Sequence, residues 1–293
     1  MSPPRQARGG WGDGYWRSKD GLELHYRDYP GPAHKPPILC IPGLTRNARD
    51  FEGVAERLAG DWRLLCVSLR GRGESGHAKD ALSYVPQSYV EDLEALIEEL
   101  KLGPFVVFGT SLGGLLAMLL SAAGPDRIAG ALLNDIGPEI EEAGLVRIRS
   151  YVGRSQSWPS WVHAARDIAA LFGEAYPDYR LEDWLVMAKR LARLTPGGRI
   201  VLDYDMKIAE PFAVSAAPAD LDMWPAFESL SGTPLVVVRG ELSDILSERT
   251  LAEMRRRVPS LEAVTVPDVG HAPTLEEPAA AAAIDRLLAR VGR

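Results

Sequence analysis

Short apolar runs alternate along most of this chain with stretches whose apolar positions recur every three to four residues. Such runs are typical of buried strands, and such stretches are typical of helices with one apolar face. After a hairpin at 15–29, strands are predicted at residues 37–41, 62–69, 105–108, 127–134, 234–238 and 261–266. Helices are predicted at residues 48–58, 87–100, 248–258 and 276–291, with a further one beginning near Leu115. This alternation favours an α/β fold, a largely parallel sheet with helices on both faces.

The alternation stops in one long segment. Residues 138–219 contain tryptophans, prolines and amphipathic helical pieces but no clear strand. We therefore expect one α/β core built from residues 1–137 and 220–293, with 138–219 inserted after the sixth core strand as a helical cap. Ligands of such sheets bind at the carboxyl ends of the strands, so the cap would overhang the binding site.

The most specific motif is Gly-x-Ser-x-Gly, centred on Ser111. A strand-like apolar run ends at Gly109, and a helix-forming stretch follows Gly114. A sharp turn between strand and helix would bring them so close that side chains at Gly109 and Gly113 would collide. The serine at its apex then adopts a strained backbone conformation. This arrangement is the nucleophile elbow, so Ser111 is the predicted catalytic nucleophile.

A serine hydroxyl needs a base, and the base needs an orienting acid. Of the five histidines, His271 alone follows a late strand and precedes the last helix, so we predict it as the base. For the acid we favour Asp244, in the loop after the strand at 234–238, because the order Ser111, Asp244, His271 is the order of hydrolase triads on this fold. Glu241 in the same loop and Asp135 after the sixth strand are the alternatives.

An oxyanion hole requires two fixed N–H donors where negative charge develops. The backbone N–H of Leu112 lies at a helix N-terminus, where the helix dipole also favours an anion. The second donor should come from the loop after the strand at 37–41. Gly43 lets that loop approach closely, so the N–H of Leu44 is the predicted donor.

Composition narrows the classes of protein. With 46% hydrophobic residues the chain can fill a sizeable core, and its net charge of −7 argues against a nucleic-acid partner. No apolar run reaches about 18 residues, so no transmembrane helix is expected. The N-terminal segment lacks the apolar centre of a signal peptide. Cys40 and Cys66 lie in strand-like runs and are expected as buried free thiols, with the cytoplasm as the compartment.

With these motifs, the chain resembles the α/β-hydrolase superfamily over nearly its whole length. Besides the elbow, residues 68–75 are similar to the family's loop after the fourth strand. Gly270 and His271, with the Glu-Glu-Pro at 276–278, are similar to its histidine loop and last helix. The resemblance implies an eight-stranded, mostly parallel sheet. One departure is the Pro-Gly pair before Leu44, where many members have His-Gly, so the brace that this histidine supplies is missing.

The serine nucleophile argues against the dehalogenases and epoxide hydrolases of this superfamily, which use aspartate. We expect a serine hydrolase that cleaves a small carboxylic ester or lactone through an acyl-enzyme, similar to esterases and enol-lactone hydrolases. No cofactor or metal is expected, and the partner is a small-molecule substrate rather than a membrane, with a homodimer left open. The alternatives are a carbon–carbon bond hydrolase acting on vinylogous diketones and a slow-turnover ligand sensor of the same fold.

The cap should determine specificity. Trp158, Trp161 and Trp184 are candidates for an apolar substrate pocket, although aromatic residues also join cap helices to one another. Several cap cations could receive a substrate carboxylate or could simply be solvated. They are Arg147, Arg149, Arg154, Lys189 and Arg190.

Overall fold

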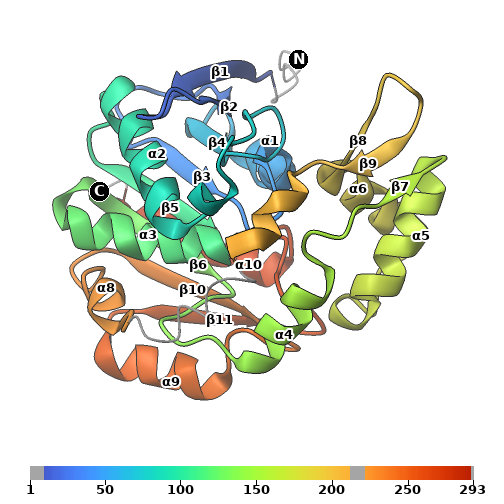
Figure 1. The fold of residues 1–293 in the computed structure, drawn as a ribbon. Coiled ribbons are helices and arrows are strands. Elements are labelled where there is room, and N and C mark those ends of the chain that lie inside the picture. Colours follow the sequence, from blue (N-terminus) through green and yellow to red (C-terminus); the bar gives the residue numbers. More distant parts are fainter. Residues whose placement is uncertain (1–9, 212–221, 292–293) are drawn as a thin grey trace, which may run out of the picture.

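A central sheet of eight strands organises the molecule (Figure 1). The structure is a computed structural model that describes residues 10–211 and 222–291. In spatial order the strands are β1 (Gly12–Arg17), β2 (Glu23–Tyr29), β4 (Leu64–Ser68), β3 (Ile38–Ile41), β5 (Phe105–Thr110), β6 (Ile128–Asn134), β10 (Leu235–Gly240) and β11 (Glu262–Val266). β2 is antiparallel to both β1 and β4, and every pair from β4 to β11 is parallel. The predicted eight-stranded α/β sheet is therefore confirmed.

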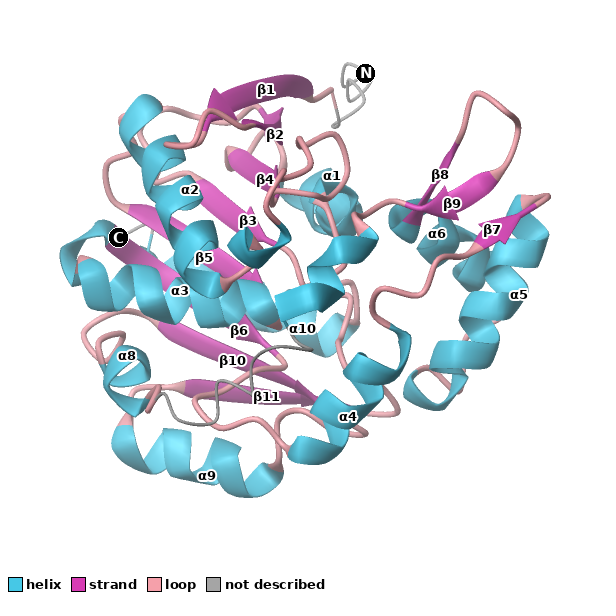
Figure 2. Cartoon of the chain, in the orientation of Figure 1, coloured by secondary structure: helices cyan, strands magenta, loops and turns pink. Residues whose placement is uncertain are grey.

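Helices cover both faces of the sheet (Figure 2). One face packs against α2 (Pro86–Glu99), α3 (Leu112–Ala123), α8 (Trp224–Glu228) and α9 (Glu248–Arg257), and the other against α1 (Glu52–Leu58) and α10 (Pro278–Val291). The central strand β5 supplies both cores. Phe105 and Val107 belong to the first core, and Val106 and Phe108 belong to the second. This alternation explains why such strands are apolar throughout.

The predicted elements of the core match the observed ones to within a few residues. The helix predicted at 48–58 begins instead as a 3₁₀ turn, which the Asn47 side chain caps by accepting a hydrogen bond from the backbone N–H of Arg49. The 3₁₀ helices are η1 (Ala48–Phe51), η2 (Ala81–Ser83), η3 (Pro125–Arg127), η4 (Gly173–Ala175) and η5 (Met206–Ala209). Cys40 and Cys66 are buried free thiols, as expected.

The segment between β6 and β10 contains strands that its sequence does not suggest. Its helices are α4 (Glu142–Tyr151), α5 (Trp161–Phe172) and α6 (Leu181–Leu191). A second, three-stranded sheet is formed by β7 (Ser157–Trp158), β9 (Ile200–Leu202) and β8 (Ala192–Leu194). The prediction of no strand is wrong here, because strands this short carry too few residues to show a two-residue period. The predicted cap boundary at 219 lies outside the described residues.

Polar contacts tie this inserted segment, which we call the cap, to the core. Asp203 follows β9 and is almost fully buried, and its carboxylate accepts a hydrogen bond from Arg49 at 2.5 Å. Asn47 and Arg49 both donate to the backbone carbonyl of Arg190, at the end of α6. An isolated antiparallel β-bridge also pairs the backbone of Tyr204 with that of Arg72, in the loop after β4. The cap therefore lies against loops that leave the carboxyl ends of the parallel strands (Figure 1).

The close approach of β5, β3 and α3 yields a stability prediction. A Cβ on Gly113 would lie 2.0 Å from the carbonyl oxygen of Ile41, which is backbone and cannot move aside. Gly113→Ala should lower the free energy of unfolding by about 2 kcal/mol or more, measured by urea denaturation. Gly103→Ala is the matched control, since a Cβ there meets no heavy atom within 4 Å. Equal unfolding midpoints for both variants would contradict the tight elbow.

Candidate active site

Ser111 sits at the apex of the turn between β5 and α3. Its φ of 53° and ψ of −117° are backbone angles that residues other than glycine rarely adopt. The glycines on either side make this possible, because a Cβ on Gly109 would lie 2.4 Å from the carbonyl oxygen of Gly113. The backbone N–H of Ser111 also donates to the Asn134 carbonyl at 3.0 Å. The turn thus has the geometry that the Gly-x-Ser-x-Gly pattern predicts.

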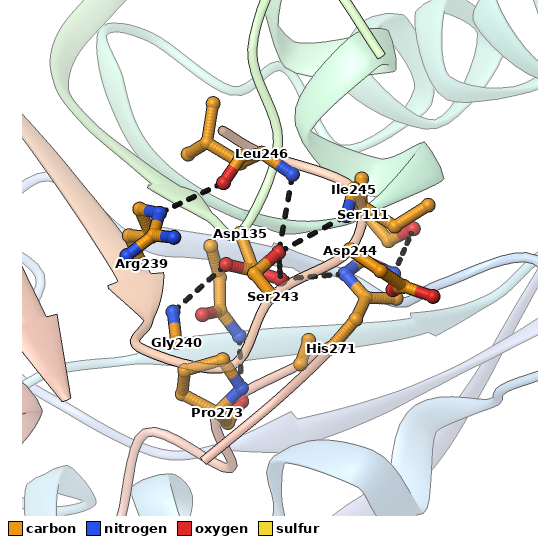
Figure 3. A network of polar contacts seen from close by, with 12 residues as sticks. Ser111, Asp135, Arg239, Gly240, Ser243, Asp244, Ile245, Leu246, His271 and Pro273 are labelled. Atoms are coloured by element: carbon orange, nitrogen blue, oxygen red, sulfur yellow. Dashed lines mark hydrogen bonds and ion pairs between the residues drawn. The ribbon is translucent and has the colours of Figure 1, made fainter. Parts of the chain in front are cut away.

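A chain of hydrogen bonds runs from Ser111 through His271 to Asp135 (Figure 3). Ser111 Oγ and His271 Nε2 are 2.8 Å apart, and His271 Nδ1 and Asp135 Oδ2 are also 2.8 Å apart. A carboxylate only accepts hydrogen bonds, so the Nδ1 proton is directed to Asp135. Nε2 is then free to accept the proton of the Ser111 hydroxyl, as a general base must.

The Asp135 carboxylate is completely buried and satisfied by three donors. Oδ1 accepts from the backbone N–H of Gly240 at 2.8 Å, and Oδ2 accepts from the Ser243 hydroxyl at 2.6 Å as well as from His271. Gly240 ends β10 and Ser243 belongs to the following loop. Hydrogen bonds to the ionised form stabilise it, so the surroundings suit a negative charge behind the imidazole.

Asp244 does not contact the imidazole in the way its sequence position predicts. Its carboxylate forms a two-pronged ion pair with Arg147 of α4, at 2.5 Å to Nε and 2.7 Å to Nη2. Burial alone would raise the pKa of Asp244, but the contacts with Arg147 and the nearby His271 lower it. Asp135 therefore replaces Asp244 as the partner of Nδ1. Glu241, the other alternative, accepts instead from a backbone N–H in the loop after β11.

Packing against the cap explains the direction of Asp244. Gly144 of α4 leaves no room for a Cβ, which would lie 2.5 Å from the Asp244 carbonyl oxygen and 2.3 Å from Cδ1 of Ile245. The backbone N–H of Glu141 also donates to the Ile245 carbonyl at 3.0 Å. The loop after β10 thus packs directly against α4, and this packing places the Asp244 carboxylate beside Arg147. Meanwhile Ser243, one residue earlier, faces the Asp135 carboxylate (Figure 3).

The two predicted oxyanion donors come from different segments near Ser111. Leu112 is the first residue of α3, and Leu44 lies in the loop after β3 and lines the same cavity as Ser111. Within residues 10–211 and 222–291, neither backbone N–H donates a hydrogen bond. Both amides are thus available to an incoming oxygen atom.

Arg72 holds the loop after β3 in place through a contact between segments distant along the chain. Its side chain is fully buried, and its Nε donates to the Leu44 carbonyl at 2.8 Å. The other nitrogens donate to the Arg70 carbonyl and to the Tyr89 hydroxyl. A guanidinium fixed at three points can replace the missing histidine of the family's His-Gly pair. Arg72 belongs to the segment 68–75, which resembles the family's loop after the fourth strand. Its partner Leu44 lies 28 residues earlier in the chain, so no local pattern predicts the contact.

A cavity between core and cap contains the Ser111 and His271 side chains. The core contributes the loops after β3 and β11, and the cap contributes α4, α5 and α6. The cap residues along its wall are Ile148, Tyr151, Phe172, Tyr176, Met187 and Arg190. The cap therefore shapes the space above the serine, as the inserted position suggested.

None of the three candidate tryptophans lines this cavity. Trp158 and Trp184 are buried in a separate apolar cluster of the cap, and Trp161 packs against it. The Trp158 indole N–H donates to Asp167 at 2.7 Å, and Trp184 packs edge-to-face on Tyr176. Their prediction as pocket residues is wrong for the serine cavity, because they join the cap elements to one another. Trp158 does line a second cavity, which shares residues with the first.

Comparison with known proteins agrees with this architecture. The chain matches the alpha/beta hydrolase family over residues 38–284 and therefore belongs to it. The described residues contain no group of three or more His, Cys, Asp or Glu side chains that could bind a metal ion. Over the same residues, no helix has the length and apolar character needed to cross a membrane.

Three relatives are informative. The chain is 38% identical to the 3-hydroxybutyrate-oligomer hydrolase of Cupriavidus necator, over 87% of this chain and 89% of that protein. It is 28% identical to the 2-(acetamidomethylene)succinate hydrolase of Mesorhizobium japonicum, over 80% and 81% of the two chains. An alpha/beta hydrolase from Novosphingobium aromaticivorans has a crystal structure with a TM-score of 0.93 and 56% identity, over 96% and 99% of the chains. Family and relatives together support a hydrolase.

The choice between the two aspartates can be tested by the reactivity of Ser111. Asp135→Asn should slow the labelling of Ser111 by a fluorophosphonate by about 10³-fold or more, because the amide no longer orients and stabilises the imidazolium. Asp244→Asn should change the rate by less than about tenfold, since its carboxylate binds Arg147 rather than Nδ1. The labelling rate is followed by gel fluorescence. If Asp244→Asn slowed the labelling more than Asp135→Asn, Asp244 and not Asp135 would be the acid that orients His271.

The Arg72 brace leads to a second prediction. Arg72→Met should lower the free energy of unfolding by about 2–4 kcal/mol, because it leaves two carbonyls and a hydroxyl buried without their donor. Thermal or urea unfolding measures this change. Arg17→Met is the control, since the Arg17 side chain is 71% exposed and its ion pair with Glu23 lies on the surface. If the two variants unfold alike, the loop is stabilised by something else.

Proposed function

We propose that this protein is a serine hydrolase that cleaves small carboxylic esters through an acyl-enzyme. The observation that carries the proposal is the hydrogen-bonded series Ser111–His271–Asp135, with both distances at 2.8 Å and the serine in a strained turn. A serine nucleophile next to an oriented histidine is the arrangement that acyl transfer requires.

In the proposed reaction, Ser111 Oγ attacks the ester carbonyl carbon while His271 Nε2 takes the hydroxyl proton. The resulting imidazolium is stabilised by Asp135. The tetrahedral intermediate collapses as the imidazolium gives its proton to the leaving alcohol, and the acyl group stays on Ser111. Water, deprotonated by His271, then attacks the acyl-enzyme in the same way and releases the acid.

Negative charge on the carbonyl oxygen would be stabilised by the N–H groups of Leu44 and Leu112. Neither donates a hydrogen bond within the described residues; Leu44 lines the cavity with Ser111, and Leu112 follows Ser111 in the chain. The Leu112 N–H also begins α3, where the helix dipole favours an anion. Arg72 holds the Leu44 carbonyl, which lies in the peptide unit next to the one that carries the Leu44 N–H, so this contact limits the movement of the loop around the donor.

One of the relatives supports an ester as the bond that is cleaved. The first relative described above hydrolyses 3-hydroxybutyrate oligomers, which are chains of short hydroxy acids joined by esters. A dimer of 3-hydroxybutyrate is therefore the first substrate to try on this chain, alongside 4-nitrophenyl esters from acetate to octanoate.

Hydrolysis of these esters by the wild type and by Ser111→Ala tests the proposal. Ser111→Ala should reduce kcat by about 10³-fold or more and abolish fluorophosphonate labelling, because the nucleophile is lost. Ser121→Ala is the matched control, since Ser121 is buried in α3 away from the cavity. Labelling of Ser111 without turnover of any ester would redirect the function to carbon–carbon cleavage or ligand sensing. An unlabelled wild type would overturn the serine mechanism.

A further inference from the structure

Two arginines line the cavity that contains Ser111. Arg46 comes from the loop after β3, two residues beyond Leu44, and Arg190 comes from α6 of the cap. Asp50 is the one carboxylate among the described residues along the wall. The charged side chains of the wall thus carry a net positive charge, although the whole protein has a net charge of −7.

Arg46 lies close to the nucleophile and remains charged. A Cβ placed on Gly43 would lie 3.3 Å from Cγ of Arg46 and 3.7 Å from Cβ of Ser111, so both side chains start beside the same point. Burial alone would lower the pKa of Arg46, but Asp50 and the nearby Tyr176 raise it.

The contacts of Arg46 leave part of its guanidinium unused. Nε and Nη2 both meet a single oxygen of Asp50, Oδ1, at 2.8 and 2.7 Å. A guanidinium has five N–H donors in a planar fork, so one carboxylate oxygen satisfies only part of it. The rest of the fork can serve an acceptor that enters the cavity.

Arg190 has a donor that is both buried and unpaired. Its Nη2 forms an ion pair with Glu276 at 2.7 Å, and 11% of its side chain is exposed. Its Nε is buried without a hydrogen-bond partner among the described residues. A buried donor without an acceptor is unfavourable, and a bound acceptor would remove this penalty. Glu276 is 41% exposed, so solvent screens its charge more than that of the arginine.

We propose that Arg46 and Arg190 bind a free carboxylate of the substrate, so that the enzyme selects esters with an anionic end close to the scissile carbonyl. Planar guanidinium groups match a carboxylate in both charge and geometry. The proposal deepens the proposed function and rests on ester hydrolysis at Ser111.

The rest of such a substrate has room in the second cavity. This cavity shares Thr45, Tyr151 and Phe172 with the first, so the two cavities are neighbours in the space around the cap. Its apolar side chains are Trp158, Ile168, Leu171, Phe172, Leu191 and Leu202, and its wall also contains Arg154 and Asp167. The apolar remainder of the substrate would lie against the apolar part of this wall.

Two matched substrates test the proposal. The first is the 3-hydroxybutyrate dimer as the free acid, and the second is the same dimer with its carboxylate converted to a primary amide. The wild type should prefer the acid by about tenfold or more in kcat/KM, mainly through a lower KM, because only the acid pairs with the arginines. Product formation is followed by chromatography.

Substitutions assign the preference to the two arginines. Arg190→Gln and the double variant Arg46→Gln/Asp50→Asn should each bring the acid-to-amide ratio towards one. The double variant removes both charges of the pair and leaves no unpaired carboxylate in the wall. Arg166→Gln is the matched control, because Arg166 is an exposed cap arginine outside the cavity, and it should keep the wild-type ratio.

Binding to Ser111→Ala, measured by calorimetry, separates this proposal from the proposed function. Tighter binding of the acid than of the amide, lost on adding Arg190→Gln, supports the carboxylate site even if no ester is hydrolysed. Equal binding and equal turnover of acid and amide would overturn the site while ester hydrolysis stands. Arginine variants that weaken acid and amide alike would also overturn it, since they would show a structural role.

Discussion

The hydrogen bond between His271 Nδ1 and the Asp135 carboxylate is the contact on which the geometry of this site depends. It joins the loop after β11 to the end of β6, and through Nε2 it reaches Ser111 at the end of β5. These strands run parallel, so their carboxyl ends meet at one edge of the sheet. The backbone N–H of Gly240 and the Ser243 hydroxyl, from β10 and its loop, complete the surroundings of the carboxylate.

The acid position connects the site to the cap. Asp135 serves the histidine, and the neighbouring loop after β10 is therefore free to pair Asp244 with Arg147 of α4. Gly144 permits this close approach. The same helix contributes Ile148 and Tyr151 to the cavity wall, so the ion pair helps to position the residues that surround the substrate.

Three arginines near the serine differ in their contacts. Arg72 is fully buried with its donors directed at protein acceptors, which fixes the loop that carries Leu44. Arg46 and Arg190 have unused or unpaired donors at the cavity, which suits recognition of a ligand rather than support of the fold. The difference lies in the partners and not in the residue type, so only the contacts distinguish the two roles.

The sequence by itself determined the sheet, the elbow and the histidine, because each depends on local pattern. Apolar runs predict the strands, and the glycines around Ser111 indicate a place where adjacent elements leave no room for a side chain. The acid depended on tertiary structure, since Asp135 and Asp244 both follow parallel strands and only loop packing decides which one reaches His271. The same holds for the cap, whose tryptophans belong to its own apolar cluster while Tyr151, Tyr176 and Arg190 line the cavity. Residues distant along the chain define such contacts, and no local pattern reports them.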